Sequence, residues 1–586
     1  MVRKGCQDRA KEAGVGVILC GCGGEMARLV QMDSLERSIR ANRQVRLLAT
    51  GPYPCSKTEI EKLGAAIAKR KLDRIVVAGC SERLFGRFFR TELARFGVEP
   101  SLVAFADIKD LSALVHRGSK AARTARALDL VRAAVTELAT ASRLETIETA
   151  IRPACVVLGG GVAGCGAAVA LASRGVKVVL VESRDQVGGM VRDLNVVYPS
   201  YQSSGEFVEG RRAELEAAGV QVITGMRPVA VKGHVGDFEI ELEPEAAGEA
   251  RDRTKLNAGA IIVATGASLL VPAGLFGYGQ DRRVITQMDL EAILRRGENP
   301  GKSIVMIQCA GSRIPERPYC SRVCCTASIV NTIFIKQKFP DAKITVLSRG
   351  FAEYAGDLDR ARQMGVEIIR YSPERAPQIK DGWVEVYDEI SEMEARIPFD
   401  LVVLAVAMVP SESTKALAKM VKMPTDVFGF MLEPHLKLRP EEAVPRGIFV
   451  AGCAHWPATI TESIVQAYSA ASRAFDLIKA GKVARAVRTV NLDAEYCRGC
   501  GKCAEVCQHG AIDLVVEEDG LKRAQLVPIA CTGCGVCVSV CPSGAATISP
   551  GSRSRPRVAA AVNAPRAPHG ARGGAGEPAA KAATEV

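Results

Sequence analysis

Two cysteine runs near the carboxyl end of the chain carry the clearest chemistry in the sequence. Each has the spacing Cys-x2-Cys-x2-Cys-x3-Cys, in which three thiolates bind one [4Fe–4S] cube and the fourth binds the neighbouring cube. A zinc site needs only four ligands, fewer than these two runs supply. We therefore predict a module that carries electrons singly through two clusters. The first is expected on Cys497, Cys500, Cys503 and Cys541, and the second on Cys531, Cys534, Cys537 and Cys507.

A glycine-rich turn indicates a second kind of site. The apolar strand 155–158 leads into Gly-Gly-Gly-Val-Ala-Gly at 159–164, then into an Ala-rich helix and a second strand that ends in an acid. Such glycines allow a tight turn and the close approach of a pyrophosphate. The helix N-terminus donates N–H groups, and the acid accepts from a ribose. We predict a bound dinucleotide. Its expected contacts are Gly159, Gly161, Gly164, Glu182 and Gly189.

Segments farther along the chain favour FAD over NAD as this dinucleotide. One apolar strand ends in Thr265-Gly266, and a later one ends at Gly452. After Thr-Glu-Ser at 461–463, a helix is expected over residues 464–480. Its positive end would face the flavin and favour a reduced, anionic flavin. Thr265, Gly266 and Gly452 therefore join the expected FAD contacts.

Cysteines replace the glycines of a second dinucleotide turn. The strand 303–308 leads into Cys-Ala-Gly-Ser-Arg at 309–313, which keeps a single glycine, so a direct NAD(P)H site is not expected. Four thiols at a strand end and a helix start can instead hold another [4Fe–4S] cube. Incidental buried cysteines are the alternative, and Cys453 is a rival for the fourth ligand position. The expected ligands are Cys309, Cys320, Cys324 and Cys325.

A further group of cysteines follows strands near the start of the chain. Cys20 and Cys22 end a first apolar strand, Cys55 follows a second and Cys80 ends a third. Because the carboxyl ends of parallel strands share one edge of a sheet, the four thiols are expected to converge and to hold a fourth cube. Buried, redox-inert thiols are the alternative. The remaining cysteines, Cys6, Cys155 and Cys165, are expected to be structural.

The elements that position these residues divide the chain of 586 residues into several domains, as its length requires. Strands and helices alternate before the flavin block, which favours a small parallel α/β sheet. We expect an α/β fold throughout, with an α+β ferredoxin domain at the end. The expected boundaries are an N-terminal α/β domain at 1–117, a helical linker at 118–150, an FAD domain at 151–482 with a degenerate second dinucleotide unit at 275–420, a two-cluster ferredoxin domain at 483–549 and a disordered basic tail at 550–586.

Composition excludes several other classes of protein. A hydrophobic fraction of 48% is that of a globular chain, and no apolar run approaches the length of a membrane span. The net charge of +12 is partly concentrated in the tail, and aromatic residues do not interleave with the cations, so nucleic-acid binding is not expected. No secretory signal is evident, so the 20 cysteines are expected to be reduced or metal-bound in a cytoplasmic protein.

The flavin block resembles the thioredoxin-reductase-like flavoproteins, and the whole order of blocks resembles the A-subunit family of heterodisulfide reductase. The resemblance covers about residues 14–548, and its most specific pieces include the glycine turn, the two ferredoxin runs and the stretches 74–81, 307–313 and 319–325. It implies that FAD takes up an electron pair and that clusters carry electrons away singly, in some members by flavin-based bifurcation. It also supports a cluster on Cys309, Cys320, Cys324 and Cys325. Two departures are the lack of cysteines over 189–232, where larger members insert another ferredoxin, and over 198–204.

We therefore predict an oxidoreductase: an FAD- and [4Fe–4S]-containing electron-transfer subunit of a heterodisulfide-reductase-like complex. Other subunits of that complex are the expected partners, with ferredoxin, hydrogenase or dehydrogenase subunits as candidates. No catalytic acid, base or nucleophile is identified, and His455 is expected to be structural or to lie at the flavin edge. One alternative is a self-contained NAD(P)H-dependent flavoprotein reductase with its ferredoxin module as acceptor, like the glutamate synthase small subunit. Another is a non-catalytic iron–sulfur scaffold.

Overall fold

The computed structural model describes residues 14–141, 143, 146–246, 252–351, 357–486 and 490–548. Cys6 and the basic tail lie outside the described residues. The chain forms two compact units, which divide between residues 144 and 145. Among the described residues, no helix is long and apolar enough to span a membrane.

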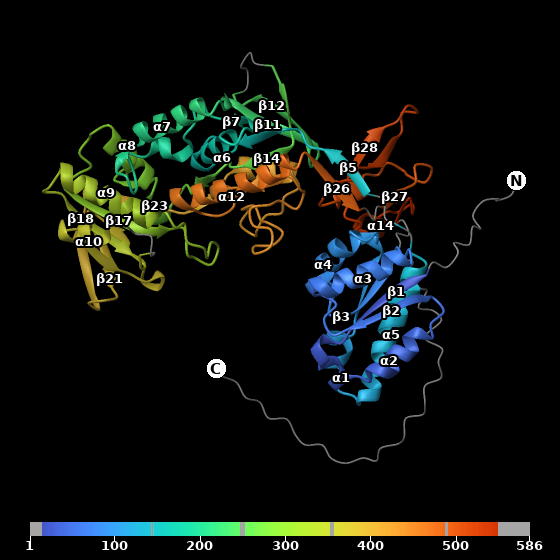
Figure 1. Ribbon diagram of the computed structural model, residues 1–586. Coiled ribbons are helices and arrows are strands. Elements are labelled where there is room, and N and C mark those ends of the chain that lie inside the picture. The colour runs from blue at the N-terminus through green and yellow to red at the C-terminus, as the bar shows by residue number, and fades with distance from the viewer. Residues whose placement is uncertain are drawn as a thin grey trace. The chain divides into compact units, whose positions relative to one another are not determined.

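The first unit is built on a parallel sheet with the strand order β2-β1-β3-β4 (Figure 1). The alternation of strands and helices predicted this sheet, but β4 was not foreseen. Buried apolar side chains lie on both faces of the sheet, under helices. The strands are β1 (Val15–Cys20), β2 (Val45–Gly51), β3 (Ile75–Gly79) and β4 (Val103–Asp107), and the main helices are α2 (Met32–Arg40), α3 (Lys57–Lys69), α4 (Glu82–Ala94) and α5 (Lys120–Ala139).

The helical linker expected at 118–150 is wrong, because most of this segment forms helix α5 of the first unit. Its apolar residues recur at helical spacing, and Val131, Val135 and Leu138 pack into the same core as β1 and β4. The helix therefore belongs to the first unit and does not connect two domains as a free rod. Residues Thr146–Ala150 form strand β5, which pairs with β26 (Lys482–Ala486) in the second unit.

The second unit begins with a parallel sheet of order β10-β7-β6-β14-β25. Helices α6 (Val162–Ala172) and α12 (Ile460–Lys479) pack over one face, and a three-stranded antiparallel sheet covers the other (Figure 1). The parallel strands are β6 (Ala154–Leu158), β7 (Lys177–Val181), β10 (Gln221–Ile223), β14 (Ala260–Val263) and β25 (Ile448–Val450), and the covering sheet is β11 (Met226–His234), β12 (Asp237–Pro244) and β13 (Thr254–Ala258).

A second parallel sheet of order β16-β23-β17-β18-β19 lies within the predicted degenerate dinucleotide unit. Helices α8 (Gln287–Arg295) and α9 (Cys324–Lys338) pack against it. The flavin block is thus a double dinucleotide-binding fold, as the sequence predicted. The strands are β16 (Val284–Thr286), β17 (Ser303–Ala310), β18 (Lys343–Ser348), β19 (Glu367–Arg370) and β23 (Leu401–Val406).

The ferredoxin region is small and consists of two antiparallel strand pairs and two short helices. Strand β27 (Val490–Leu492) pairs with β30 (Ala546–Ile548), and β28 (Ile512–Val516) pairs with β29 (Lys522–Leu526). Each helix, α13 (Lys502–Glu505) and α14 (Val536–Ser539), begins just before the third cysteine of a run. Cys503, Cys531 and Cys537 are themselves members of its small buried core.

Candidate functional site

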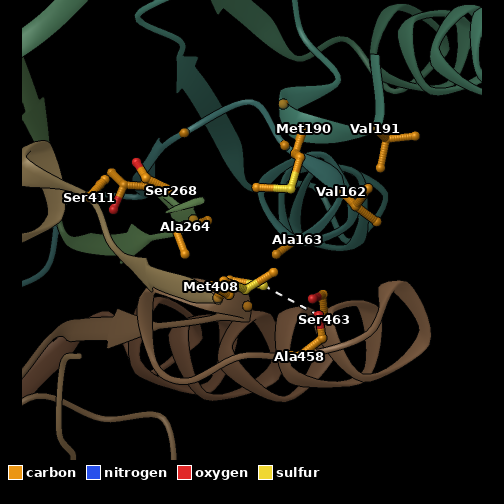
Figure 2. A pocket seen from close by; sticks show the side chains of 18 of the residues that line it. Val162, Ala163, Met190, Val191, Ala264, Ser268, Met408, Ser411, Ala458 and Ser463 are labelled. Carbon is orange, nitrogen blue, oxygen red and sulfur yellow. Dashed lines mark hydrogen bonds between the residues drawn. The ribbon is translucent and has the colours of Figure 1, made fainter. Parts of the chain in front are cut away.

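A cavity of about 1270 Å³ lies between the two dinucleotide units and is lined by nearly all the predicted FAD contacts, since only Gly164 is absent from its wall. Figure 2 shows Val162 and Ala163 of α6 on one side, with Ala458, which lies just before α12, and Ser463, in the first turn of α12, on the other. The strand end that carries Ala264 contributes a further wall. The cavity lies at the carboxyl ends of the parallel strands, where open α/β sheets bind their ligands.

The glycine turn requires its glycines for steric reasons. Gly159 has φ +108°, and a Cβ there would lie 2.3 Å from the Ala264 carbonyl oxygen. A Cβ on Gly164 would lie 1.8 Å from the Gly159 carbonyl oxygen. Gly189, with φ +55°, approaches the turn so closely that its Cβ would be 2.9 Å from the Gly161 Cα. The backbone itself therefore forms the wall of the cavity, which fits a bound pyrophosphate.

Glu182 follows β7 directly, lines the cavity and is 6% exposed. Its carboxylate accepts from the Gly160 N–H at 2.6 Å and from the Arg184 N–H at 2.8 Å. The predicted ribose acid thus also holds the glycine turn against β7.

Helix α12 directs its N-terminus into the cavity, as expected, but it begins at Ile460 and not at Ile464. The physical reason is the cap: the Thr459 Oγ1 accepts from the Glu462 N–H, and the Glu462 carboxylate accepts from the Thr459 N–H. The sequence signal was the capping box formed by Thr459 and Glu462, which places the helix start four residues before the predicted one. Gly452 is held nearby, since its N–H donates to the Gln466 Oε1 at 3.0 Å.

Thr265 and Gly266 line the cavity beside α11 (Glu412–Met420). The hydroxyls of Thr265 and Thr414 lie 2.9 Å apart, and the Thr414 hydroxyl donates to the Gly266 carbonyl at 3.1 Å. This contact fixes the strand end that follows β14. These hydrogen bonds tie the Thr-Gly turn to α11.

Glu291 was not identified from the sequence, yet it lines the cavity and is 3% exposed. Its carboxylate accepts from the Asn195 N–H and from the Asn331 side-chain amide, each at 2.7 Å. Burial raises the pKa of Glu291 to about 7, against these two hydrogen bonds and the charge of Arg295. The available signal was a charged residue on the apolar face of α8, between Leu290 and Leu294.

The structure brings the four cysteines of the flavin block together at the end of β17 and the start of α9. Cys309, Cys324 and Cys325 are buried, and Cys320 is half-buried. The pKa of Cys324 is raised by its hydrogen bond with Cys325, by burial and by the nearby Cys309 and Cys320 thiols. The Arg322 N–H points at the Cys320 sulfur at 3.3 Å, as N–H groups do around cluster ligands. The donor set fits a [4Fe–4S] cube.

Cys453 lies apart from this group. It lines the FAD cavity, and its thiol donates to the Ala458 carbonyl at 3.4 Å. Burial raises the pKa of Cys453, and the charge that acts on it is that of Glu462, with no contribution from another cysteine. Of the two rivals for the fourth ligand position, Cys309 is the one that adjoins the other three thiols.

The N-terminal cysteines also converge, at the carboxyl edge of the β2-β1-β3 strands. Burial raises the pKa of Cys80 to about 11, with further contributions from Cys22, Cys20 and Cys55. The Cys22 N–H points at the Cys20 sulfur at 3.4 Å. Lys109, which follows β4, donates from Nζ to the Cys22 sulfur at 3.2 Å and pairs with Glu25. No sequence pattern indicated this lysine, because the strand before it was not foreseen.

In the ferredoxin region the thiols fall into the two crossed groups that the spacing predicts. One small cavity is lined by Cys497, Cys500, Cys503 and Cys541. The thiols that act on Cys537 are those of Cys507, Cys531 and Cys534. Backbone N–H groups point at the sulfurs of Cys497, Cys507, Cys531 and Cys541, at 3.3 to 3.5 Å. Within the described ranges, no three His, Cys, Asp or Glu side chains are arranged to hold a single metal ion.

His455 is buried and is not among the residues that line the cavity. Its Nε2 pairs with the Glu433 carboxylate, and its ring lies 3.7 Å from that of Trp456. Burial lowers the pKa of His455, against the raising effect of Glu433. These contacts fit a structural histidine.

Two family models match the chain. Residues 496–545 match the 4Fe-4S dicluster domain, and residues 153–307 match the pyridine nucleotide-disulphide oxidoreductase family. The first match covers both ferredoxin runs, and the second ends just before Cys309. These matches support [4Fe–4S] clusters and FAD as the cofactors.

Whole proteins with a similar sequence extend over most of the chain. It is 30% identical to the second iron-sulfur A-subunit of CoB–CoM heterodisulfide reductase of Methanopyrus kandleri, over 87% of this chain and 92% of that protein. It is 27% identical to the A-subunit of the H2:CoB-CoM heterodisulfide, ferredoxin reductase of Methanothermobacter marburgensis, again over 87% and 92%. Among solved structures, thioredoxin reductase of Lactococcus lactis is similar at 19% identity and a TM-score of 0.41, over 56% of this chain and 99% of that one.

Proposed function

The chain belongs to the A-subunit family of heterodisulfide reductase, and we propose that it is the FAD- and iron–sulfur-containing electron-transfer subunit of a complex of this kind. The chain is an oxidoreductase. Its terminal substrate would react on another subunit, because the described wall of the cavity offers a single thiol, that of Cys453, outside the predicted cluster groups. The name of the relative from Methanothermobacter marburgensis includes ferredoxin, which supports ferredoxin as one redox partner.

The single observation that carries the proposal is the position of Cys324. It lines the FAD cavity and also belongs to the four-thiol group at the start of α9. FAD, when bound, exchanges electrons in pairs and singly, whereas a [4Fe–4S] cube accepts one electron at a time. A thiol shared by the cavity wall and the cluster group therefore supports electron exchange between the two cofactors at short range.

The chain's own residues would bind and orient the FAD. The glycine turn admits the pyrophosphate, and Glu182 fixes that turn. The N-terminus of α12 offers backbone N–H groups and a positive dipole to an anionic flavin edge. Glu291, with a pKa of about 7, can hold or release a proton inside the cavity at neutral pH.

We propose four clusters, with the ligand sets predicted from the sequence and Cys309 as the fourth ligand of the flavin-domain group. The domain boundaries of the proposal are an N-terminal domain that includes α5, an FAD domain over 151–482 and a ferredoxin domain over 483–549. In its finer form, the proposal is that the electron pair is divided between a high-potential and a low-potential acceptor. The flavin-domain cluster would then carry electrons toward one of these two acceptors.

Anaerobic purification with quantification of iron, sulfide and flavin tests the proposal. About 16 iron atoms per FAD are expected for four cubes, and about 8 would contradict both clusters outside the ferredoxin region. Cys324→Ser should remove about 4 iron atoms, whereas Cys155→Ala, a buried cysteine outside every group, should remove none. Bleaching of flavin and clusters by NADH alone would instead indicate a self-contained NAD(P)H-dependent reductase.

The protonation of Glu291 has a test of its own. Its pKa is raised from 4.5 to about 7 in the folded chain, so the folded chain keeps a proton that the unfolded chain releases. The free energy of unfolding should therefore fall as the pH rises from about 4.5 to about 7, by about 3 kcal/mol, and stay level above that range. Glu291→Gln should remove this slope in urea titrations at several pH values. An unchanged slope would show that Glu291 is not the titrating group.

A further inference from the structure

Two reciprocal hydrogen bonds connect the loop that carries Cys309 to the residue that follows β18. The Arg313 Nη1 donates to the Arg349 carbonyl at 3.2 Å, and the Arg349 Nη1 donates to the Ser312 carbonyl at 3.3 Å. Both arginines are half-buried. These two hydrogen bonds therefore hold two guanidinium groups near Cys309, the first thiol of the flavin-domain group.

Both cations act on Cys309 itself. The Arg313 side chain hydrogen-bonds to the Cys309 thiol, and the charges of Arg313 and Arg349 both act on its sulfur. The two arginines thus stabilise negative charge at this sulfur. A cluster bound there would lie in the same field, because Cys309 would be one of its ligands.

These two charges differ from two other cations that lie beside predicted cluster ligands. Lys109 at the N-terminal group is paired with Glu25, and Arg322 beside Cys320 is paired with Glu462. Within the described part of the chain, neither Arg313 nor Arg349 forms an ion pair with a carboxylate. Among the described residues, the two positive charges on the Cys309 side of the group are therefore not paired with a carboxylate.

We propose that Arg313 and Arg349 raise the reduction potential of the cluster bound by Cys309, Cys320, Cys324 and Cys325. The inference rests on the proposed function, since it assumes that cluster. Reduction of a [4Fe–4S] cube adds one electron, breaks no bond and requires no proton. A fixed cation nearby favours the reduced form, because it offsets the added negative charge in a region screened from water. Arginine keeps its charge at any working pH, so the effect should not depend on pH.

The test is an EPR-monitored redox titration of the purified holoprotein and its variants. Arg349→Gln and Arg313→Gln should each lower the reduced-to-oxidised ratio of this cluster about tenfold at a fixed solution potential. Arg349→Lys should restore most of the ratio. Arg317→Gln is the matched control: Arg317 lies in the same loop and donates to the Gly311 carbonyl at 2.6 Å, but it is not among the charges that act on Cys309.

The outcomes separate this inference from the proposed function. If Cys324→Ser leaves the iron content unchanged, no cluster is bound by this group, and both proposals are wrong. A cluster that is present but keeps its potential in Arg313→Gln and Arg349→Gln would overturn the inference alone. An equal shift in Arg317→Gln would also overturn it, because the cause would then be the shape of the loop. If one glutamine variant loses iron, the other variant and Arg349→Lys still decide the question.

Discussion

The ferredoxin region and the N-terminal unit both gather four-cysteine groups, but they build them in different ways. In the ferredoxin region the thiols lie on short loops, and three of them are members of a core of seven residues. In the N-terminal unit the thiols lie at the edge of a four-stranded sheet whose two apolar cores contain helices and strands throughout. The cofactor is expected to be part of the core in one region and an addition at its edge in the other.

This difference concerns folding as well as electron transfer. A small region whose core includes several of the ligands folds together with its metal, because the free energy of binding is then free energy of folding. A sheet with its own apolar core can fold first and bind afterwards.

Removal of iron should produce the largest contrast. Anaerobic chelation is expected to unfold the ferredoxin region and to leave the N-terminal sheet folded, because the sheet keeps both of its apolar cores. Hydrogen exchange should show loss of protection in β27 to β30 and unchanged protection in β1 and β3. Equal loss in both regions would contradict the contrast.

Paired cysteine variants should show the same contrast at single sites. Cys537→Ser and Cys80→Ser should each remove about 4 iron atoms. Only Cys537→Ser should also loosen its region, since Cys537 is buried in the small core whereas Cys80 is half-buried at a sheet edge. Limited proteolysis with iron analysis distinguishes the two. A Cys80→Ser protein that is cleaved within 14–141 would show that the N-terminal sheet depends on its cluster.

Glycines between the ligands offer a smaller effect. Gly499, between Cys497 and Cys500, has φ +64°, and a Cβ there would lie 2.2 Å from the Lys522 carbonyl oxygen. Gly21, between Cys20 and Cys22, has φ −84°, and its Cβ would have 3.5 Å to the nearest atom. Gly499→Ala should cost about 1–3 kcal/mol, and Gly21→Ala should cost less than about 0.5 kcal/mol. Chemical denaturation monitored at the cluster absorbance measures both, and similar losses would refute the steric argument.

Groupings that depend on local spacing or on a simple rule of topology could be predicted from the sequence. The grouping of the ferredoxin thiols could be predicted directly from their spacing, because a short loop determines where each thiol lies. The N-terminal group followed from the common edge of parallel strands, although β4 was missed. What could not be predicted depends on contacts between distant residues. Glu291 meets Asn331 from another helix, and Arg349 reaches Ser312 across two strand ends. No local pattern encodes such pairs.

The packing of α5 illustrates the same limit of prediction from sequence, here for the fold and not for the site. Its spacing of apolar residues predicted a helix correctly, yet an apolar stripe does not say what covers it. The Arg74 guanidinium, which donates to the carbonyls of Leu138 and Ala141 at 3.1 Å, holds the end of α5 to the sheet. The assignment of this helix to a linker was wrong because its partners in the sheet are distant in the sequence.

Lys109 gives a small predicted effect and the most direct test of the edge site. Its Nζ lies between the Cys22 sulfur at 3.2 Å and the Glu25 carboxylate at 2.8 Å. Lys109→Met keeps most of the length of the side chain but removes the charge. Solvent screens this edge, so the variant should lose less than about 1 kcal/mol of stability. It should also keep its iron, because no thiol ligand is lost. Arg95→Met, which removes an exposed pair with Glu92 on another part of the unit, is the control in the same denaturation assay. If Lys109→Met released about 4 iron atoms, the lysine would be required to assemble the N-terminal cluster site.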